Sequence, residues 1–302
     1  MILALFSILA ALLFAPFLFG VINRTKALFA GRTGQPLLQM YYDLYKLGNK
    51  GVVYSHTISW VFRVYPVLAL AGMLLVLLLL PQGGHVALLA GPGDLFALAY
   101  ILALVRFFNV IAALDTGSSF EGMGASREVQ FSALAEIAFL LGLCTLACVT
   151  GSYSLSGIYT QLSYSAWLAH GAVFLLIAIA FFIVFLAENA RIPVDDPNTH
   201  LELTMIHEVM ILDSSGPDLA FLHYASALKF WILGSLLIGL LFPIHTGYGL
   251  IDVAFAWLGL LVLAVSVGIV ESIMARLRLL RVPQLLVSAS VFSFVALIFL
   301  LR

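Results

Sequence analysis

Ionisable side chains gather in one short segment of a chain that otherwise has few of them. Residues 188–213 hold six carboxylates, one arginine and two histidines, although only 10% of the 302 residues are charged and 63% are hydrophobic. Carboxylates and imidazoles exchange protons readily, and partial burial shifts their proton affinity. Glu188 ends a hydrophobic run and Arg191 follows closely, so we expect this pair to be half-buried. The segment is therefore predicted to be the polar centre of the molecule.

Three further ionisable residues interrupt hydrophobic runs elsewhere in the chain, namely Arg106, Glu136 and Glu271. A charge at the centre of a membrane helix costs about 2.5–3.5 kcal/mol on insertion scales, so each is expected to face other helices, with a partner or water. Two roles remain open for these residues. Pairing of Arg106 with Glu136 explains one charge of each sign, whereas a proton relay explains why carboxylates outnumber cations here.

Motifs for metal binding or catalysis are not found in the sequence. Cys144 and Cys148 lie one helical turn apart in an apolar run, match no zinc or iron–sulfur spacing, and are predicted to be small packing residues. His207-Glu208 lacks the second histidine of a zinc protease motif. We therefore predict no metal site, no redox cofactor and no catalytic residue on this chain. The net charge of −1 also argues against nucleic acid as a partner.

A Gly/Ser-rich stretch at residues 115–128 resembles a nucleotide-binding loop only superficially. Its Gly122 and Gly124 complete neither a dinucleotide motif nor a phosphate-loop motif, and no strand precedes them. The stretch is instead predicted to be a tight re-entrant connection that directs Arg127 and Glu128 into a helix bundle.

The hydropathy of the chain indicates its fold class. The mean hydropathy is +1.12, far above that of soluble globular proteins, and a membrane span needs about 20 mainly apolar residues. By this criterion we predict an all-α, polytopic membrane protein that forms a single integral membrane domain over residues 1–302. Eight spans are expected, at about 2–22, 60–81, 94–114, 129–150, 166–187, 226–242, 253–271 and 284–301.

Basic residues alternate between the connections and predict the orientation. Lys and Arg lie in or beside the odd-numbered connections, while the even-numbered connections have none. The positive-inside rule therefore places both termini outside the cytoplasmic (inner) membrane, with Arg302 as the one outer cation. The predicted cytoplasmic loops cover about 23–59, 115–128, 188–225 and 272–283.

The acidic segment is also expected to contain a helix at the membrane boundary. Asp196-Pro197 is a good helix start, and Met205, Val209 and Leu212 recur at helical spacing. We therefore predict an amphipathic helix that lies along the inner membrane boundary and ends near Ser214.

Four ordered motifs on the predicted inner connections resemble those of one known family. They are Gly31-Arg-Thr-Gly with Gln39-x-Tyr-x-Asp43-x-x-Lys46-Leu; Leu114-Asp-Thr-Gly-Ser…Gly124-Ala-Ser-Arg-Glu128, with Glu136 as the next matching acid; Glu188-x-x-Arg191-x-Pro193-x-Asp195-x-Pro197…Glu202-Leu; and Glu271-Ser-Ile-Met-Ala-Arg276-Leu-Arg278. The chain thus resembles the complex I membrane subunit 1 family, most closely its membrane-bound [NiFe] hydrogenase branch of formate hydrogenlyase subunit 4 and hydrogenase-4 C subunits.

The resemblance implies a subunit that docks a peripheral redox arm and passes coupling on through carboxylates. It implies hydrogenase-like large and small subunits on the cytoplasmic face, antiporter-like membrane subunits and surrounding lipid as partners. It also implies that [NiFe] and iron–sulfur clusters lie on partner subunits and not on this chain, and that a quinone could bind. The residues matched to ion coupling are Glu128, Glu136, Glu188, Arg191, Asp195, Glu202 and His200. Those matched to docking or to a cavity are Arg32, Gln39, Asp43, Lys46 and Arg127.

The chain departs from the broader family pattern inside the acidic motif. Asn198 and His200 stand where that motif has two glutamates, and Val194 replaces its phenylalanine. These changes weaken the case for a standard quinone chamber. His200 could still relay a proton, because the ordinary pKa of histidine lies near physiological pH.

These observations lead to one main hypothesis and two alternatives. The main hypothesis is a membrane subunit of an energy-converting hydrogenase-type complex, which couples electron transfer in partner subunits to translocation of protons or sodium ions. The first alternative is the quinone-site membrane subunit of an NADH:quinone oxidoreductase of the complex I type. The second is a passive membrane anchor.

Overall fold

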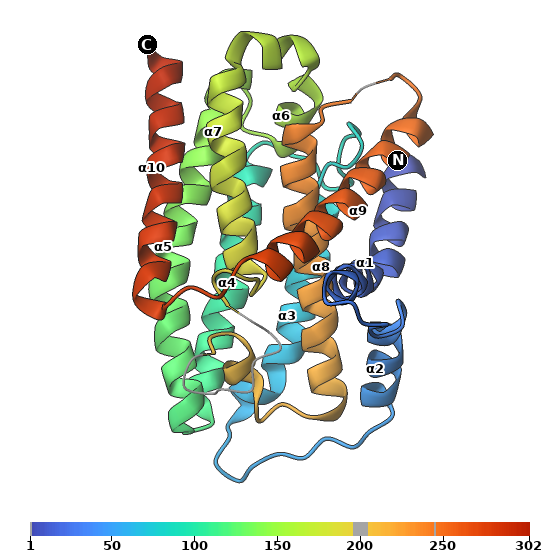
Figure 1. Cartoon of the computed structure of the whole chain (residues 1–302), viewed down its shortest axis with the longest axis vertical. Helices are drawn as coiled ribbons and strands as arrows, with labels where there is room; N and C mark the ends of the chain where they lie inside the picture. The colour runs from blue at the N-terminus through green and yellow to red at the C-terminus, as the bar shows by residue number, and fades with distance from the viewer. Residues whose placement is uncertain (1, 196–204, 245) are drawn as a thin grey trace.

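A computed structural model describes residues 2–195, 205–244 and 246–302. Over these residues the chain is built from helices without β-strands, apart from one isolated bridge between Gln82 and His85 (Figure 1). The helices are α1 (Ile2–Phe29), α2 (Gln39–Gly48), α3 (Trp60–Leu79), α4 (Asp94–Asp115), α5 (Ser119–Thr150), α6 (Leu155–Gln161), α7 (Tyr164–Glu188), α8 (Gly216–Leu241), α9 (Gly249–Ile273) and α10 (Val282–Leu301), with short 3₁₀ helices at Glu208–Ile211 and Leu279–Arg281.

The predicted all-α membrane fold is confirmed. Eight helices among the described residues are long and apolar enough to span a membrane: α1, α3, α4, α5, α7, α8, α9 and α10 with its preceding turn. Helices α5 and α8 begin about ten residues earlier than predicted, at Ser119 and Gly216. At 1.5 Å per residue the 32 residues of α5 reach about 48 Å, well beyond the roughly 30 Å hydrocarbon core of a bilayer. Its first turns therefore extend past the apolar layer.

The early start of α5 corrects the interpretation of residues 115–128. These residues were expected to form a re-entrant loop, but only 116–118 separate α4 from α5. Arg127 and Glu128 consequently lie on the third turn of a helix. Helix geometry, and not a loop, fixes the direction of their side chains.

The predicted amphipathic helix after Asp196 is wrong over the part that the structure describes. Residues 196–204 lie outside the described residues, and 205–215 contain only the short 3₁₀ helix Glu208–Ile211. The apolar side chains of Met205, Val209 and Met210 are buried in a small cluster with Ala113 of α4 and Ala125 of α5. This part of the segment therefore packs into the bundle.

Helix α2 is an amphipathic helix that the sequence pattern did not reveal. It lies in the first long connection and packs against α1 and α8. Met40, Leu44 and Leu47 recur along one face of α2 and line a cavity, whereas Tyr42 and Tyr45 are exposed. The helix therefore forms a wall between the cavity and the outside of the molecule.

Pro16 explains how α1 is joined to its neighbours. Proline has no backbone N–H, so the carbonyl of Leu12, four residues earlier, loses its helical donor. The hydroxyl of Tyr224 on α8 donates to this carbonyl at 2.7 Å, and Tyr41 on α2 donates to the next carbonyl, that of Leu13. The bend in α1 thereby becomes an attachment point for α2 and α8 (Figure 1).

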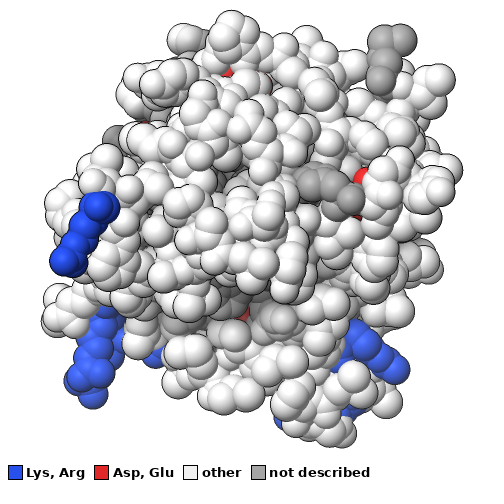
Figure 2. Space-filling model, turned by 90° about the horizontal axis from the view of Figure 1, so that it is seen from above, with Lys and Arg blue, Asp and Glu red and all other residues white. Residues whose placement is uncertain are grey.

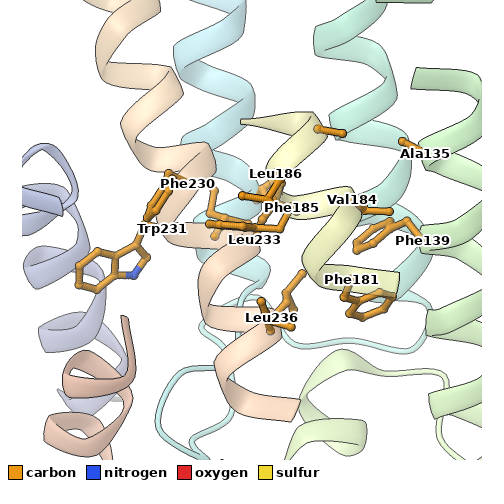
Figure 3. Close-up of a cluster of buried hydrophobic side chains, with 14 of the residues drawn as sticks. Ala135, Phe139, Phe181, Val184, Phe185, Leu186, Phe230, Trp231, Leu233 and Leu236 are labelled. Carbon is orange, nitrogen blue, oxygen red and sulfur yellow. The ribbon is translucent and has the colours of Figure 1, made fainter. Parts of the chain in front are cut away.

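The apolar core follows α8, which packs against α1, α2, α3, α7 and α9. Aromatic rings fill the space between α8, α7 and α5 (Figure 3). The ring centroids of Phe185 and Phe230 are 4.8 Å apart, and those of Phe139 and Phe181 are 5.3 Å apart. Gly142 on α5 allows this approach, because a Cβ at this position would lie 2.3 Å from the ring of Phe181.

Replacing Gly142 with leucine is predicted to push α5 away from α7 and to destabilise the protein by about 1–3 kcal/mol, as overpacked cores do. Gly171→Leu on α7 is the matched control, because nothing lies within 4 Å of a Cβ there. Thermal unfolding of the detergent-solubilised variants measures the difference. Equal stability of the two variants would contradict the packing role of Gly142.

Candidate functional site

A cavity of about 570 Å³ opens between α1, α2, α3, α4 and α8. Its apolar wall includes Phe19, Met73 and Leu102, and its rim includes polar residues of α2. Its inner wall is strongly charged. The ionisable residues that line this inner part are Arg106, Glu128, Glu188, Arg191, His207, Glu208, His223 and Lys229.

Arg106 is the hub of the charged wall. Its guanidinium lies 2.7 Å from Glu188, 3.2 Å from Glu136 and 3.7 Å from Glu128. These carboxylates come from α7 and α5, so one cation on α4 joins three helices. The pairing of Arg106 with Glu136, one of the two roles left open by the sequence, is present in the structure, and Glu136 is one of three partners. Such pairing compensates the cost of placing ionised groups away from water.

Glu188 is shared between Arg106 and Lys229 of α8, whose Nζ lies 2.6 Å from its second oxygen. The expectation of a half-buried Glu188–Arg191 pair is therefore corrected. Both side chains are more deeply buried than expected, at 9% and 4% exposed, and they belong to different groups of ion pairs.

The turn that ends α7 explains why the side chains of Glu188 and Arg191 form ion pairs with different partners. The backbone N–H of Arg191 donates to Leu186 and that of Ala190 donates to Ala187, which is the Schellman pattern of a helix C-terminus. Ala190 takes the left-handed conformation that this pattern needs, with φ at 51°. The chain turns there, and the two side chains enter different groups of ion pairs.

Arg191 belongs to a second ion-pair group near α1 and α9. Its guanidinium lies 3.3 Å from Glu271, whose other oxygen is 2.8 Å from Nζ of Lys26. The same guanidinium stacks over the rings of Phe19 and Phe230, 4.5 and 5.7 Å from their centroids. Arg191 therefore fixes the start of the connection between α7 and α8 against three spans.

Asp195 and His207 join this connection to the Arg106 group. The Asp195 carboxylate lies 2.8 Å from Arg276 and accepts hydrogen bonds from the backbone N–H groups of Ile206 and His207 at 3.2 and 3.1 Å. The His207 ring lies between two carboxylates, with Nε2 3.1 Å from Glu128 and Nδ1 3.4 Å from Asp195. A continuous series of ionic contacts thus runs from Arg276 to Glu136.

These contacts shift the proton affinities of the connection. Burial alone would lower the pKa of His207, but the carboxylates of Glu128 and Asp195 outweigh it and raise the pKa to about 10. Burial would raise the pKa of Asp195, but hydrogen bonds and charge from His207, with the charge of Arg276, hold it below its ordinary value. Burial raises the pKa of Glu208.

The first turns of α5 clamp the segment that carries His207. Arg127 donates to the carbonyl of Met205 at 2.9 Å, and the backbone N–H of Asp213 donates to Glu121 at 3.1 Å. Between them, a Cβ on Gly124 would lie 2.4 Å from Val209, so only glycine permits this close contact. The Gly-Ala-Ser-Arg-Glu sequence therefore places His207 against Glu128.

The predicted coupling residues divide into three sets. Glu128, Glu136, Glu188 and Asp195 belong to the Arg106–His207 group, and Arg191 belongs to the Glu271 group. Glu202 and His200 lie outside the described residues. The structure therefore brings together five of the seven predicted side chains in two neighbouring groups.

The predicted docking residues lie on the cavity rim and on the exposed surface. Gln39, Asp43 and Lys46 line the cavity from α2, where the Gln39 amide donates to Asp43 at 2.9 Å. Arg32 is exposed in the loop before α2. Arg127 instead holds the His207 segment, as described above.

Several members of the ionic groups were not selected as site residues from the sequence. From the sequence, Arg276 was placed in a family motif and His207 in an incomplete metal motif, and neither Lys26 nor Lys229 was given a role. Lys229 gave a usable signal, because it interrupts an apolar run. Nothing in the sequence indicated the ion-pair partners of Lys26, His207 and Arg276, since those partners lie in distant parts of the chain.

Cys144 and Cys148 were predicted to be packing residues, but both are exposed on the outside of α5. Among the described residues no group of three or more His, Cys, Asp or Glu side chains is arranged to hold a metal ion.

Comparison with known proteins places the chain in a family. The family model for NADH dehydrogenase matches residues 2–301. Formate hydrogenlyase subunit 4 of Escherichia coli (strain K12) is 31% identical over 293 residues, which cover 95% of this chain and 94% of that protein. Hydrogenase-4 component C of the same organism is 31% identical over 277 residues, with coverage of 90% and 86%.

The fold has a close structural counterpart. A chain from the membrane-bound sulfane sulfur reductase, an archaeal respiratory membrane complex, superimposes with a TM-score of 0.84 at 19% identity, covering 99% of this chain and 98% of that one. At this identity the likeness shows the fold alone. The family match and the two sequence relatives show that the chain belongs to the NADH dehydrogenase subunit 1 family.

Proposed function

We propose that this chain is the membrane subunit of an energy-converting hydrogenase-type complex. In this proposal it docks the peripheral redox arm and couples electron transfer there to translocation of protons or sodium ions. The observation that carries the proposal is the continuous series of ionic contacts from Arg276 and Asp195, in the connections, through His207 and Glu128 to Arg106 and Glu136. Titratable groups in contact are what a coupling route between a redox arm and a membrane needs.

The charge distribution supports an orientation with this network toward the cytoplasm. Figure 1 shows both termini at the end of the molecule opposite α2, and Figure 2 views that end and shows Lys and Arg only near its margin. Basic residues in the connections at the opposite end fit the positive-inside rule. We therefore propose that both termini lie outside the inner membrane.

The same distribution suggests where partners bind. The names of the relatives support hydrogenase-like large and small subunits against the cytoplasmic connections, where Arg32, Lys46 and the exposed Tyr45 offer contacts. These partners, not this chain, carry the [NiFe] and iron–sulfur clusters in our proposal. Antiporter-like subunits and lipid cover the apolar sides of the helices.

Within the network, proton movement requires that the ion pairs rearrange. Arg106 contacts three carboxylates, so a proton that enters this group replaces one of these ion pairs. Glu136 is the most accessible of the three, with 37% of its side chain exposed. We propose that Glu136 is the point from which charge passes to the neighbouring membrane subunits.

The cavity favours a second candidate function, the quinone site of a complex I-type enzyme. Its volume of about 570 Å³ lies within the usual range for small-molecule sites, and Tyr65 and Asn109 could donate to a quinone oxygen. A bound quinone would accept electrons from the redox arm. The charged wall around Arg106 fits an apolar ring poorly, which makes this the second candidate.

The two candidates differ in a direct assay of the purified complex. The hydrogenase-type function predicts nickel in the copurified partners and hydrogen production or uptake. The quinone function predicts no nickel and reduction of an added short-chain quinone. Metal analysis and both assays on one preparation decide between them.

Replacing Glu136 with glutamine is predicted to uncouple the complex. The variant keeps the size of the side chain but cannot ionise, so ion translocation per electron pair falls about tenfold or more while electron transfer stays near the wild-type rate. Asp213→Asn is the matched control, because the Asp213 side chain is exposed and lies in the same connection as His207. Translocation is measured in vesicles that contain the whole complex. Glu202→Gln is predicted to uncouple the complex in the same way. Normal ion translocation by both the Glu136→Gln and the Glu202→Gln variants would contradict the coupling role.

A pH dependence follows from the raised pKa of His207. Protonated His207 stabilises the fold, and this contribution is complete below the ordinary histidine pKa of about 6.5 and is lost as the pH rises toward about 10. The stability difference between the wild type and His207→Gln should therefore be largest at pH 6 and shrink steadily up to pH 10, as measured by thermal unfolding. A difference that grows with pH would contradict protonation of His207 in the folded state.

A further inference from the structure

The position of His207 suggests a more specific role within the proposed function. Its two ring nitrogens contact two different carboxylates that come from different parts of the chain, Glu128 on α5 and Asp195 after α7. The ring also lines the cavity and is 22% exposed to it. Among the described ionic contacts, His207 is the bridge between the Asp195–Arg276 pair and the Arg106 group.

The charge balance of the network depends on this residue. Arg106, Lys229 and Arg276 are the permanent cations in contact with Glu128, Glu136, Glu188 and Asp195. Within these ion pairs of the described residues, three positive charges thus face four carboxylates. A protonated His207 supplies the fourth positive charge of this set, and a neutral His207 leaves the set with one negative charge in excess. Loss of its proton therefore favours protonation of a neighbouring carboxylate.

We infer that His207 is the proton-transfer residue that connects Asp195 with Glu128, an inference that rests on the proposed coupling function. In one direction the imidazolium gives its Nε2 proton to Oε2 of Glu128. An N–H bond breaks, an O–H bond forms, and the products are a neutral imidazole and a neutral carboxyl group. Glu128 then passes its proton on and becomes a carboxylate again. A water molecule in the cavity, which the His207 ring lines, takes the remaining proton from Nδ1 and returns one to Nε2, and a proton delivered through Asp195 to Nδ1 restores the imidazolium. No oxidant or reductant takes part.

The surroundings of His207 hold it in the geometry that this transfer requires. Its backbone N–H donates to the same Asp195 oxygen that faces Nδ1, and Arg127 fixes the carbonyl of Met205 two residues earlier. The acidic groups that act on the ring or share its surroundings are Glu128, Asp195, Glu188 and Glu208. The basic groups near them are Arg106, Lys229 and Arg276, with Arg191 and His223 beside Glu208.

Replacing His207 with lysine tests whether the positive charge of His207 or its ability to transfer a proton is required. Lysine keeps the positive charge near neutral pH, where its ordinary pKa of about 10.4 leaves it protonated, but it has one nitrogen and cannot pass a proton from one side of a ring to the other. In vesicles that contain the whole complex, His207→Lys should retain electron transfer within about twofold and lose ion translocation about tenfold or more. His170→Gln, near the opposite end of α7 from this network, is the control.

A second variant covers the case in which His207→Lys fails to assemble. His207→Ala leaves space beside the cavity, and added imidazole should restore part of its ion translocation without changing electron transfer. Wild-type translocation by the lysine variant, or an assembled alanine variant that imidazole does not restore, overturns the inference. A wild-type complex that transfers electrons without translocating ions instead refutes the proposed function.

Discussion

The contact of Arg106 with three carboxylates is the interaction on which the polar interior depends. An isolated arginine or glutamate at this depth would be expensive, and each of the four groups is tolerated because the others are present. The hub also has a mechanical effect, since it ties α4 to α5 and α7. Lys229 adds α8 to the same group. Buried hydrophobic side chains pack α5, α7 and α8 together (Figure 3), and the charged hub adds ionic contacts between α4, α5 and α7.

The connection after α7 links the Arg106 group to the end of the molecule where the basic residues lie. Its beginning is held by Arg191 against Glu271 and two aromatic rings, and its later part is held by the first turns of α5. His207 lies between these two attachments. A displacement of the connection by a bound partner would therefore change the distance between His207 and Glu128 together with the packing of Met205 and Val209 against α4 and α5. This gives a physical route from a docking event to a change in carboxylate proton affinity.

Hydropathy was sufficient to predict the eight spans, because each needs only a long apolar run. The helix ends were less predictable: Ser119 and Gly216 begin helices whose first turns are polar, and the sequence alone does not distinguish such turns from loops. The pairing of Arg106 with Glu136 was predictable, since few buried charges compete for partners. The position of His207 between Glu128 and Asp195 was not predictable, because Glu128 lies far from His207 in the sequence. The separation of Glu188 from Arg191 depends on the left-handed turn at Ala190, which no residue type at that position signals.

We propose that the Arg106 network couples electron transfer to ion translocation. The number of ions moved per electron pair reports this coupling, measured in vesicles that contain the whole complex with wild-type Arg106 or with Arg106→Gln. We expect the wild type to build an ion gradient, and the variant to transfer electrons with little or no gradient. An unchanged ratio in the assembled variant, or electron transfer without any gradient in the wild type, would contradict the account.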